Sequence, residues 1–453
     1  YIEVTGGKNM MEDSVLGKML NRLNVMEPQQ VYAVLQENGL GVSDVTPFAQ
    51  MWEAAGGMLT GDSILFVDGF DRALKIPDKG YPGMSLQKTG SEKAIRGSNE
   101  GFGDSIKQNT ALIRKRLRSV DLKVAECKCG RRTGTNVDIM YLDGIVRPEI
   151  VTQMQQRLAA CEIDGIGDSG VIEQLTETQW FSPFPQYQTT RRPDRAVMAL
   201  LEGLALFLAD NSPEVVIFPT DYSSVIKMTN DYYTRWEIAT FTRTLRYVAA
   251  FLSMIQPGLY LAMTNFHTQL LPTKLLLSFA AARQGVPFPG VVEVLLMELS
   301  FELLREAGVR LPGAMGNTIG IVGGLIIGQA AVDANIVSPM VVIVVAFTAL
   351  CSFAIPNEDF ATAFRLLKFV FIGLSAALGF YGFLLGLLIL LIHLAQLESF
   401  GMPYLMPFVG ADLNDYRDER DSLVRPPLQA LTHRPFYANP KNRVRLRMKY
   451  KDR

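Results

Sequence analysis

Three long apolar runs follow one another in the second half of the chain, and few charges interrupt them. They cover residues 315–332, 340–355 and 370–397, and the last contains only His393 among Asp, Glu, Lys, Arg and His side chains. A helix needs roughly 20 apolar residues to cross about 30 Å of hydrocarbon. A buried helix of a soluble protein rarely stays apolar on every face for that long. The pattern therefore predicts membrane-spanning helices with membrane lipid around them.

Glycines at a spacing of four residues mark the first of these runs. Gly320, Gly324 and Gly328 recur every four positions and so form two overlapping G-x-x-x-G pairs. An interior glycine costs a soluble helix roughly 1 kcal/mol. In lipid, small residues let two helix backbones approach closely. We therefore expect these three glycines to form a helix-packing face.

The number of membrane crossings depends on two ambiguous segments. Residues 360–397 are too long for one helix and barely long enough for two, with a natural break at Gly379-Phe380-Tyr381-Gly382. A further apolar segment, 241–263, begins next to several arginines, and the last residues of the chain are basic, which favours the cytoplasmic side for both ends. The crossings must then be even in number. Six follow if 291–307 crosses and 360–397 is a hairpin, and four if 291–307 is interfacial and 360–397 is one tilted span.

The segment 291–307 is unusual because it carries carboxylates among apolar residues. A lone carboxylate that faces lipid costs several kcal/mol, so this face must meet water, partners or other helices. It is either an interfacial helix with a wet side or a helix that lines a water-filled path. Gln329 and Asp333 end the glycine-rich run as a loop cap or as part of the same path. The candidate pore-lining residues are Glu293, Glu298, Glu302, Gln329 and Asp333.

The first half of the chain is mixed and charged, and its shorter patterns predict both strands and helices. Strands are expected at 63–67, 73–76, 122–129, 137–146 and 214–218, and helices at 102–117, 148–161 and 193–208. The sequence Phe181-Ser182-Pro183-Phe184-Pro185 is a breaker cluster and predicts a subdomain boundary. The order of strands and helices predicts a cytoplasmic α/β domain in two subdomains.

These patterns predict an α+β multi-domain membrane protein, in which an N-terminal α/β domain precedes an α-helical transmembrane domain. The expected units are a polar, partly helical or disordered segment (1–60), two α/β subdomains (61–180 and 181–235), a transmembrane domain of four to six segments (236–405) and a basic cytoplasmic tail (406–453). The first residues show no apolar signal segment, so we expect the first half to stay in the cytoplasm.

Composition narrows the function further. The formal net charge of the 453 residues is −1, which gives no basic surface for nucleic acid. Four cysteines provide no disulfide framework, and Cys127 and Cys129 have no further ligand cluster nearby for a metal. The G-x-G-x-x-G match at 165–170 follows a predicted helix instead of a strand, which favours a loop over a dinucleotide site. With three histidines and no nucleophile–base set, we expect no enzyme and no cofactor.

Several motifs in the same order resemble one family, the A-subunit (GerA-type) spore germination proteins of endospore-forming bacteria. The resemblance covers roughly residues 61–408. Its closest parts are Glu100-Gly101-Phe102, Ser182-Pro183-Phe184-Pro185-Gln186, Arg192-Pro193-Asp194, Gly285-Val286-Pro287-Phe288-Pro289, Arg305-Glu306-Ala307-Gly308-Val309-Arg310-Leu311-Pro312, Gly328-Gln329-Ala330-Ala331-Val332, Ile336-Val337-Ser338-Pro339 and Ser399-Phe400-Gly401.

This resemblance implies an A subunit of a nutrient germinant receptor, or a close sporulation paralogue, in the spore inner membrane. It further implies a transporter-like B subunit that holds the nutrient, a lipoprotein C subunit, and a homo-oligomeric ring, a pentamer, that conducts ions when nutrient binds. An acidic path would favour cations by raising their local concentration. The alternative is a non-conducting membrane scaffold or signalling subunit that assembles germination or sporulation proteins.

Overall fold

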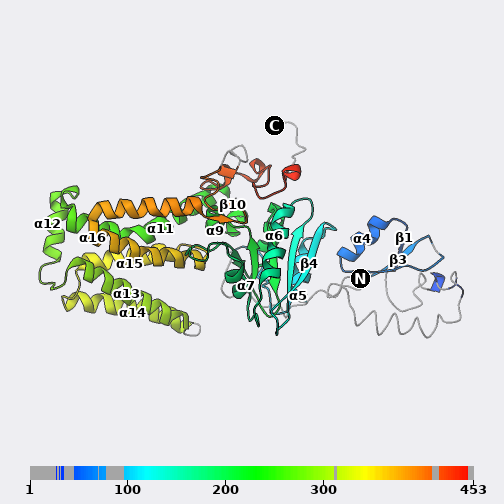
Figure 1. Cartoon of the computed structure of the whole chain (residues 1–453), viewed down its shortest axis with the longest axis horizontal. Helices are drawn as coiled ribbons and strands as arrows, with labels where there is room; N and C mark the ends of the chain where they lie inside the picture. Colours follow the sequence, from blue (N-terminus) through cyan, green and yellow to red (C-terminus); the bar gives the residue numbers. More distant parts are fainter. Residues whose placement is uncertain are drawn as a thin grey trace.

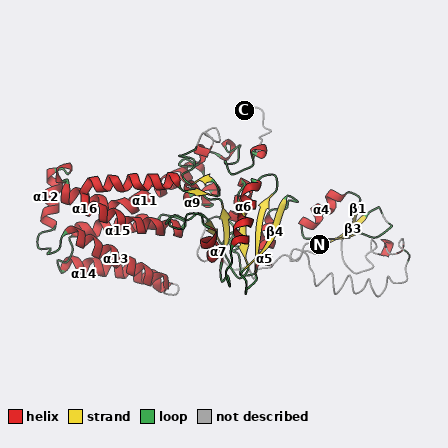
Figure 2. Cartoon of the chain, viewed as in Figure 1, coloured by secondary structure: helices red, strands yellow, loops and turns green. Residues whose placement is uncertain are grey.

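Alternating apolar positions in the first half form strands, and the long apolar runs of the second half form helices (Figure 1, Figure 2). The computed structural model describes residues 27, 30, 32–34, 45–69, 71–77, 96–310, 314–410 and 418–446. Most of the predicted segment 1–60 and the last seven residues of the tail lie outside this part. The chain thus combines a mixed α/β N-terminal domain with antiparallel sheets and a long helical C-terminal region.

A small antiparallel sheet with the order β1-β3-β2 forms first. Its elements are β1 (Thr46–Phe48), α4 (Met51–Leu59), β2 (Ser63–Leu65) and β3 (Ala73–Ile76). β2 and β3 pair in antiparallel register, so the hairpin predicted from 63–67 and 73–76 is confirmed.

A five-stranded sheet with the order β4-β5-β7-β8-β6 is the centre of the N-terminal domain, and all its neighbours are antiparallel. Its strands are β4 (Leu122–Cys129), β5 (Thr135–Leu142), β6 (Gln188–Thr190), β7 (Ala205–Ala209) and β8 (Val215–Phe218), and α5 (Ile106–Arg116), α6 (Pro148–Ala160), α7 (Ser169–Thr176) and α8 (Pro193–Glu202) accompany them. Every residue of β7 and β8 is buried. Strands from both predicted subdomains therefore share one sheet and one core.

The helix predicted over 193–208 is wrong in its second half. Gly203 adopts φ +98° and ends α8 with a left-handed cap, a conformation that glycine reaches without steric cost. One residue later the chain enters β7 (Ala205–Ala209), in the middle of the sheet. An all-apolar run of five residues does not distinguish a buried strand from a buried helix, which explains the error.

In the described residues, two short helices lead into the helical region, and six longer ones form it. The elements are α9 (Tyr222–Ile226), α10 (Asn230–Tyr233), α11 (Trp236–Leu261), α12 (Thr273–Ala282), α13 (Gly290–Arg310), α14 (Ala314–Asp333), α15 (Pro339–Phe353) and α16 (Glu358–Gln396). Among the described residues, Trp236–Phe266 and Glu358–Gln396 are long and apolar enough to span a membrane.

Helix α16 folds back on itself at Gly379, where φ is +61° and ψ is −138°. A side chain at this glycine would meet Phe266 at 2.7 Å, so the bend requires glycine both for its backbone angles and for its space. The two arms pack against each other, with the ring centroids of Phe371 and Phe383 5.9 Å apart. The break predicted at 379–382 is confirmed, and residues 360–397 form a hairpin.

The long helices alternate in direction between the end beside the sheet and the far end (Figure 1). Ion pairs join Glu298 and Glu302 of α13 to Lys368 and Arg365 of α16 in reverse order, so α13 is antiparallel to the first arm of α16. α13 also runs parallel to α15, because its first turn contacts Ser338 and its last turns contact Ser352. The hairpin in α16 is one of the two conditions of the six-segment alternative, and the number of membrane crossings stays a prediction.

The two regions meet at an aromatic junction. Phe184, from the loop after α7, lies against Phe360 and Phe364 of α16 with ring centroids 5.9 and 5.8 Å apart. The strands β9 (Glu398–Ser399) and β10 (Met402–Pro403) follow α16 immediately, and Ser399 Oγ donates to Gln186 O at 2.9 Å. The N-terminal domain is therefore packed directly onto both ends of the α16 hairpin.

Candidate functional site

Two of the predicted glutamates of α13 meet a lysine in the middle of the helical region. Lys368 Nζ lies 2.6 Å from Glu298 Oε2 and 2.9 Å from Glu302 Oε1. Glu298 is 1% exposed and Lys368 4% exposed, so both charges are withdrawn from solvent in the single chain. A buried charge is tolerated only when it is paired and hydrogen-bonded. Within the part of the chain that the structure describes, Glu298 Oε1 nevertheless has no hydrogen-bond partner.

The charges continue from this buried pair toward the end of the helices beside the sheet. Arg365 Nη1 lies 3.3 Å from Glu302 Oε2, and Arg365 Nη2 lies 3.4 Å from Glu358 Oε1. Arg305 of α13 pairs with the same Glu358 oxygen at 2.8 Å. Three acids and three bases thus form one chain of ion pairs, which we call the charge ladder. Exposure of the acid side chains rises along it, from 2% at Glu298 to 70% at Glu358.

Glu293 lies one step further from the sheet, at the start of α13. Its Oε2 accepts a hydrogen bond of 2.8 Å from the backbone N–H of Ser338, at the start of α15. Its Oε1 is 3.2 Å from Arg283 Nη2, which comes from the turn after α12. Glu293 is completely buried, so it fastens two helix starts and the α12 turn together.

The two remaining candidates lie apart from the ladder. Gln329 Nε2 donates to Asp333 Oδ1 at 2.9 Å, and both side chains are exposed on the last turns of α14. The structure therefore joins Glu298 and Glu302 through Lys368 and leaves Gln329 and Asp333 as a separate surface pair.

The glycine-rich helix α14 packs against α13 and α15 through part of its predicted face. A side chain at Gly324 would lie 3.5 Å from Phe301, and one at Gly328 would lie 3.4 Å from Val342. Gly323 is tighter still, with Leu304 at 2.8 Å. The surroundings of Gly320 lie outside the described residues. Close approach of this kind is what small residues permit in helix pairs.

Sequence reasoning missed both cations of α16. Lys368 and Arg365 stand three residues apart on one helix, and Glu298 and Glu302 stand four apart on another, so the two faces match when the helices run antiparallel. A lysine flanked by Leu366, Leu367, Phe369 and Val370 was a usable signal, because an ionisable group in an apolar run marks a functional site by default.

A second buried charge cluster ties the tail to the start of α11. Arg243 and Arg246 both pair with Asp231 of α10, and Arg243 Nη1 also lies 2.7 Å from Asp421 Oδ1. Burial alone would raise the pKa of Asp421, but Lys227 and Arg243 hold it below its ordinary value. Two of the arginines beside the predicted apolar segment 241–263, Arg243 and Arg246, are thus neutralised inside the protein, and Arg243 holds residues 421 and 422 against α11.

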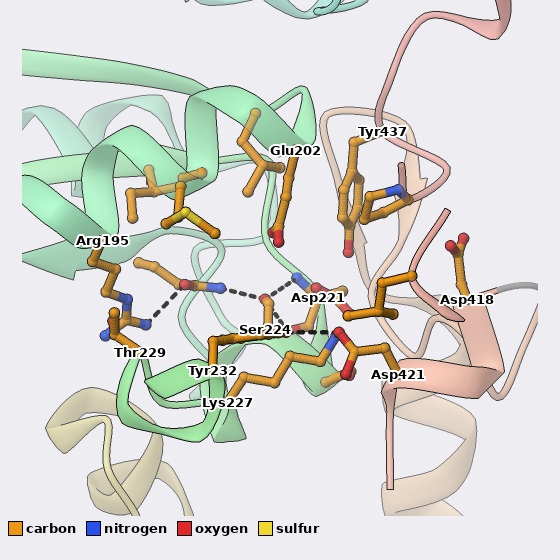
Figure 3. A pocket seen from close by; sticks show the side chains of 18 of the residues that line it. Arg195, Glu202, Asp221, Ser224, Lys227, Thr229, Tyr232, Asp418, Asp421 and Tyr437 are labelled. Atoms are coloured by element: carbon orange, nitrogen blue, oxygen red, sulfur yellow. Dashed lines mark hydrogen bonds and ion pairs between the residues drawn. The ribbon is translucent and has the colours of Figure 1, made fainter. Parts of the chain in front are cut away.

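A pocket beside this cluster has a volume of about 130 Å³ and mixed charge (Figure 3). In Figure 3, Lys227 points toward Asp421. The hydroxyl of Ser224 accepts a hydrogen bond from the backbone N–H of Asp221 on the other side of the pocket. Basic side chains in its lining already interact with neighbouring acids or carbonyl oxygens. Arg195 donates to the side-chain oxygen of Gln188, and Arg445 pairs with Glu202. The pocket therefore lies at a junction where residues of the sheet, α9 and the tail already satisfy one another's charges. The charge ladder remains the better candidate site.

Comparison with known proteins relates the whole chain to one group. Residues 1–437 match the family described as Bacillus/Clostridium GerA spore germination protein. Spore germination protein KA of Bacillus subtilis (strain 168) is 38% identical over 445 residues, which are 98% of this chain and 81% of that protein. The uncharacterized membrane protein YfkQ of the same organism is 39% identical over 439 residues, 96% of this chain and 84% of that protein.

One solved structure is also similar. It is the crystal structure of the N-terminal domain of the A subunit of the Bacillus megaterium spore germinant receptor GerK3. The two sequences are 28% identical, and the match covers 47% of this chain and 76% of that one with a TM-score of 0.34.

Proposed function

This chain belongs to the GerA family of Bacillus/Clostridium spore germination proteins, as an A subunit of a germinant receptor, and from that premise we propose that several copies enclose an ion path through the membrane. The family is one of receptors and not of enzymes. The proposed assembly is a homo-oligomeric ring, a pentamer, in the spore inner membrane. Its path releases cations when a nutrient is bound and so triggers germination.

The charge ladder is the observation that supports this proposal. It lies between α13, α15 and α16, whose other residues are mostly apolar. Placing six charged groups there is costly, and charged side chains inside membrane regions mark ion paths or relays. A ring of acidic side chains, one set from each copy, would concentrate cations at its centre. Glu293, Glu298 and Glu302 are the proposed pore-lining residues, with Gln329 and Asp333 second.

In the single chain the ladder corresponds to the closed state of such a path. Lys368 occupies the position next to Glu298 and Glu302 that a passing cation would need. Conduction then requires Lys368 to move away from α13, so opening is a shift between a paired and a separated arrangement of α13 and α16. A ligand can drive that shift only by binding the two arrangements with different affinity.

In the proposed receptor, partner subunits supply the difference in affinity between the paired and the separated arrangement of α13 and α16. A transporter-like B subunit holds the nutrient, and a lipoprotein C subunit completes the complex. The N-terminal domain assembles neighbouring copies or passes the bias on, because Phe184 and Gln186 connect it to both ends of the α16 hairpin.

Ion conduction by the purified full-length chain tests the proposal. In planar bilayers, with B and C subunits and nutrient supplied, we expect cation-selective currents. The double substitution Glu298→Gln and Glu302→Gln should weaken both the currents and ion release from spores while the protein is still made and assembled. Glu398→Gln, at an exposed glutamate after α16, is the matched control and should conduct normally. Unchanged currents in the double variant would remove these two residues from the path.

A non-conducting scaffold is the second candidate, and the burial of Glu298 and Lys368 favours it over an open pore in the single chain. In a scaffold the ladder would only hold α13 and α16 together. Such a protein gives no current in the bilayer experiment under any nutrient condition, yet it still captures its partner subunits.

A further inference from the structure

The loop between α7 and β6 presents two large aromatic side chains that nothing in the described chain covers. Trp180 is 79% exposed and Phe181 is 85% exposed, and their rings pack edge to face with centroids 5.7 Å apart. Neither contributes to the aromatic junction, which uses Phe184 of the same loop. Adjacent exposed aromatic rings are costly in water and mark a surface for a partner or a membrane.

The same loop is fastened to the end of the helical hairpin. Ser182 Oγ and His393 Nε2 are 2.8 Å apart, and Gln179 Nε2 donates to Gln396 O at 3.3 Å. These contacts lie on either side of Trp180 and Phe181 and join them to the last turn of α16. The two rings are therefore held at the height where the apolar helix ends.

An apolar surface on α16 continues from this point toward the far end. Its side chains are about half exposed and none is charged: Leu388 55%, Ile389 54%, Leu391 55% and Ile392 49%. Because α16 is long and apolar enough to span a membrane, we expect these residues to face lipid. Trp236, 41% exposed at the start of α11, lies at the same end of the helical region. Tryptophan and other aromatic residues gather where a span meets the headgroups, because their rings suit an environment between oil and water.

We infer that Trp180 and Phe181 insert into the headgroup layer of the bilayer and dock the N-terminal domain on the membrane surface. The occupant of this surface is lipid, because Gln179 and Ser182 hold the loop of the two rings against the last turn of α16, and the exposed side chains just before that turn are apolar. The inference does not depend on ion conduction, so it stands or falls separately from the proposed function. It makes the loop a second membrane anchor, next to the helices themselves.

Tryptophan fluorescence tests this directly, since the chain contains only three tryptophans. Trp52→Phe with Trp236→Phe leaves Trp180 as the only one in the full-length protein. In vesicles of phosphatidylcholine and phosphatidylglycerol, acyl chains brominated near the headgroup should quench its emission strongly, and chains brominated near their ends much less, because aromatic rings gather at the membrane–water interface. Aqueous acrylamide should quench it weakly.

The matched control keeps Trp52 alone, through Trp180→Phe and Trp236→Phe. Trp52 is 70% exposed on α4, a nearly equal exposure outside the helical region. It should respond to acrylamide and ignore brominated lipid. Where a single-tryptophan variant folds poorly, the difference in emission between wild type and Trp180→Phe gives the same signal. Quenching of Trp180 by acrylamide but not by brominated lipid would overturn the inference, because it would show that the ring lies in water. Emission that resists both quenchers and changes with protein-to-lipid ratio would overturn it in favour of a second copy.

Discussion

Replacing Lys368 by methionine should destabilise the helical region more than any other single loss of a surface or ladder charge. Glu298 has no other cationic partner among the contacts described, whereas Glu302 keeps Arg365 at 3.3 Å. The substitution thus leaves one carboxylate buried and unpaired at 1% exposure. Removing one partner of a buried ion pair costs about 3–5 kcal/mol. That corresponds to a rise of roughly a hundred- to several-thousandfold in the unfolded fraction.

A second substitution, at Glu298, completes a double-mutant cycle and separates the effect of charge from the effect of packing. Glu298→Gln with Lys368→Met removes both charges and keeps similar side-chain volume, so most of the loss should return. The coupling between the two positions is expected near the upper end of the range of about 0.5–3 kcal/mol for residues in direct contact. Lys274→Met, at an exposed lysine of α12, is the control and should change stability by less than about 0.5 kcal/mol.

Thermal unfolding in detergent provides the measurement. Cys351 is buried in α15, beside the Ser352 that accepts from Arg305, so its reaction with a thiol dye reports opening of this region. Each kcal/mol shifts the midpoint by about 2–4 °C for a unit of 150–250 residues, so Lys368→Met should lower it by roughly 6–20 °C. An unchanged midpoint would refute the pairing. A double variant no more stable than Lys368→Met alone would refute the assignment of Glu298 as its partner.

Two further predictions concern the bend of α16 and the acids near its first turn. Gly379→Ala should destabilise the hairpin by about 1–3 kcal/mol, because φ is positive there and Phe266 fills the space, whereas Gly373→Ala, with nothing within 4 Å, should be neutral or stabilising in the same thermal assay. Burial and then the carboxylate of Asp359 raise the pKa of Glu173 to about 8. Its charged form is the disfavoured one. The contribution of Glu173 to stability is therefore greatest below about pH 4.5 and is lost as the pH rises to about 8. Glu173→Gln should therefore match wild type at pH 4.5 and exceed it by about 1–2 kcal/mol at pH 8.5, after allowance for solvent screening. Equal midpoints at both pH values would contradict the raised pKa.

Local patterns were sufficient for the elements whose periodicity is unambiguous. The strand predicted at 122–129 coincides with β4, and the helix predicted from Pro148 coincides with α6 to within one residue. The match at 165–170 follows α6, as expected, and runs through a loop into the first turn of α7. β7 was mistaken for helix because five apolar residues in succession carry no period. The short strand β6 gave no signal, since three polar residues at a sheet edge resemble a loop.

The candidate site shows the limit of reading one segment at a time. The acidic face of α13 was visible from the four-residue spacing of Glu298 and Glu302, and the need for a partner followed from the cost of a charge in lipid. The identity of the cation that pairs with these glutamates depends on contacts between residues 66 to 70 positions apart in the sequence, and on the direction in which α16 runs. Neither is encoded in local spacing. The break at Gly379 was predicted correctly, but it does not by itself give the direction of the first arm of α16. That direction follows from the packing of α16 against α11.

The first turns of α16 belong to the charge ladder and to the aromatic junction at the same time. Glu358 accepts ion pairs from Arg305 and Arg365, while Phe360, two residues later, packs against Phe184 of the N-terminal domain. A helix transmits displacement along its axis because its backbone hydrogen bonds resist stretching. A shift of the N-terminal domain relative to α13 must therefore move Arg365 and Lys368 along α13 together. If the ladder closes the proposed path, this shared element is where a movement outside the membrane becomes a change in the pairing of Glu298.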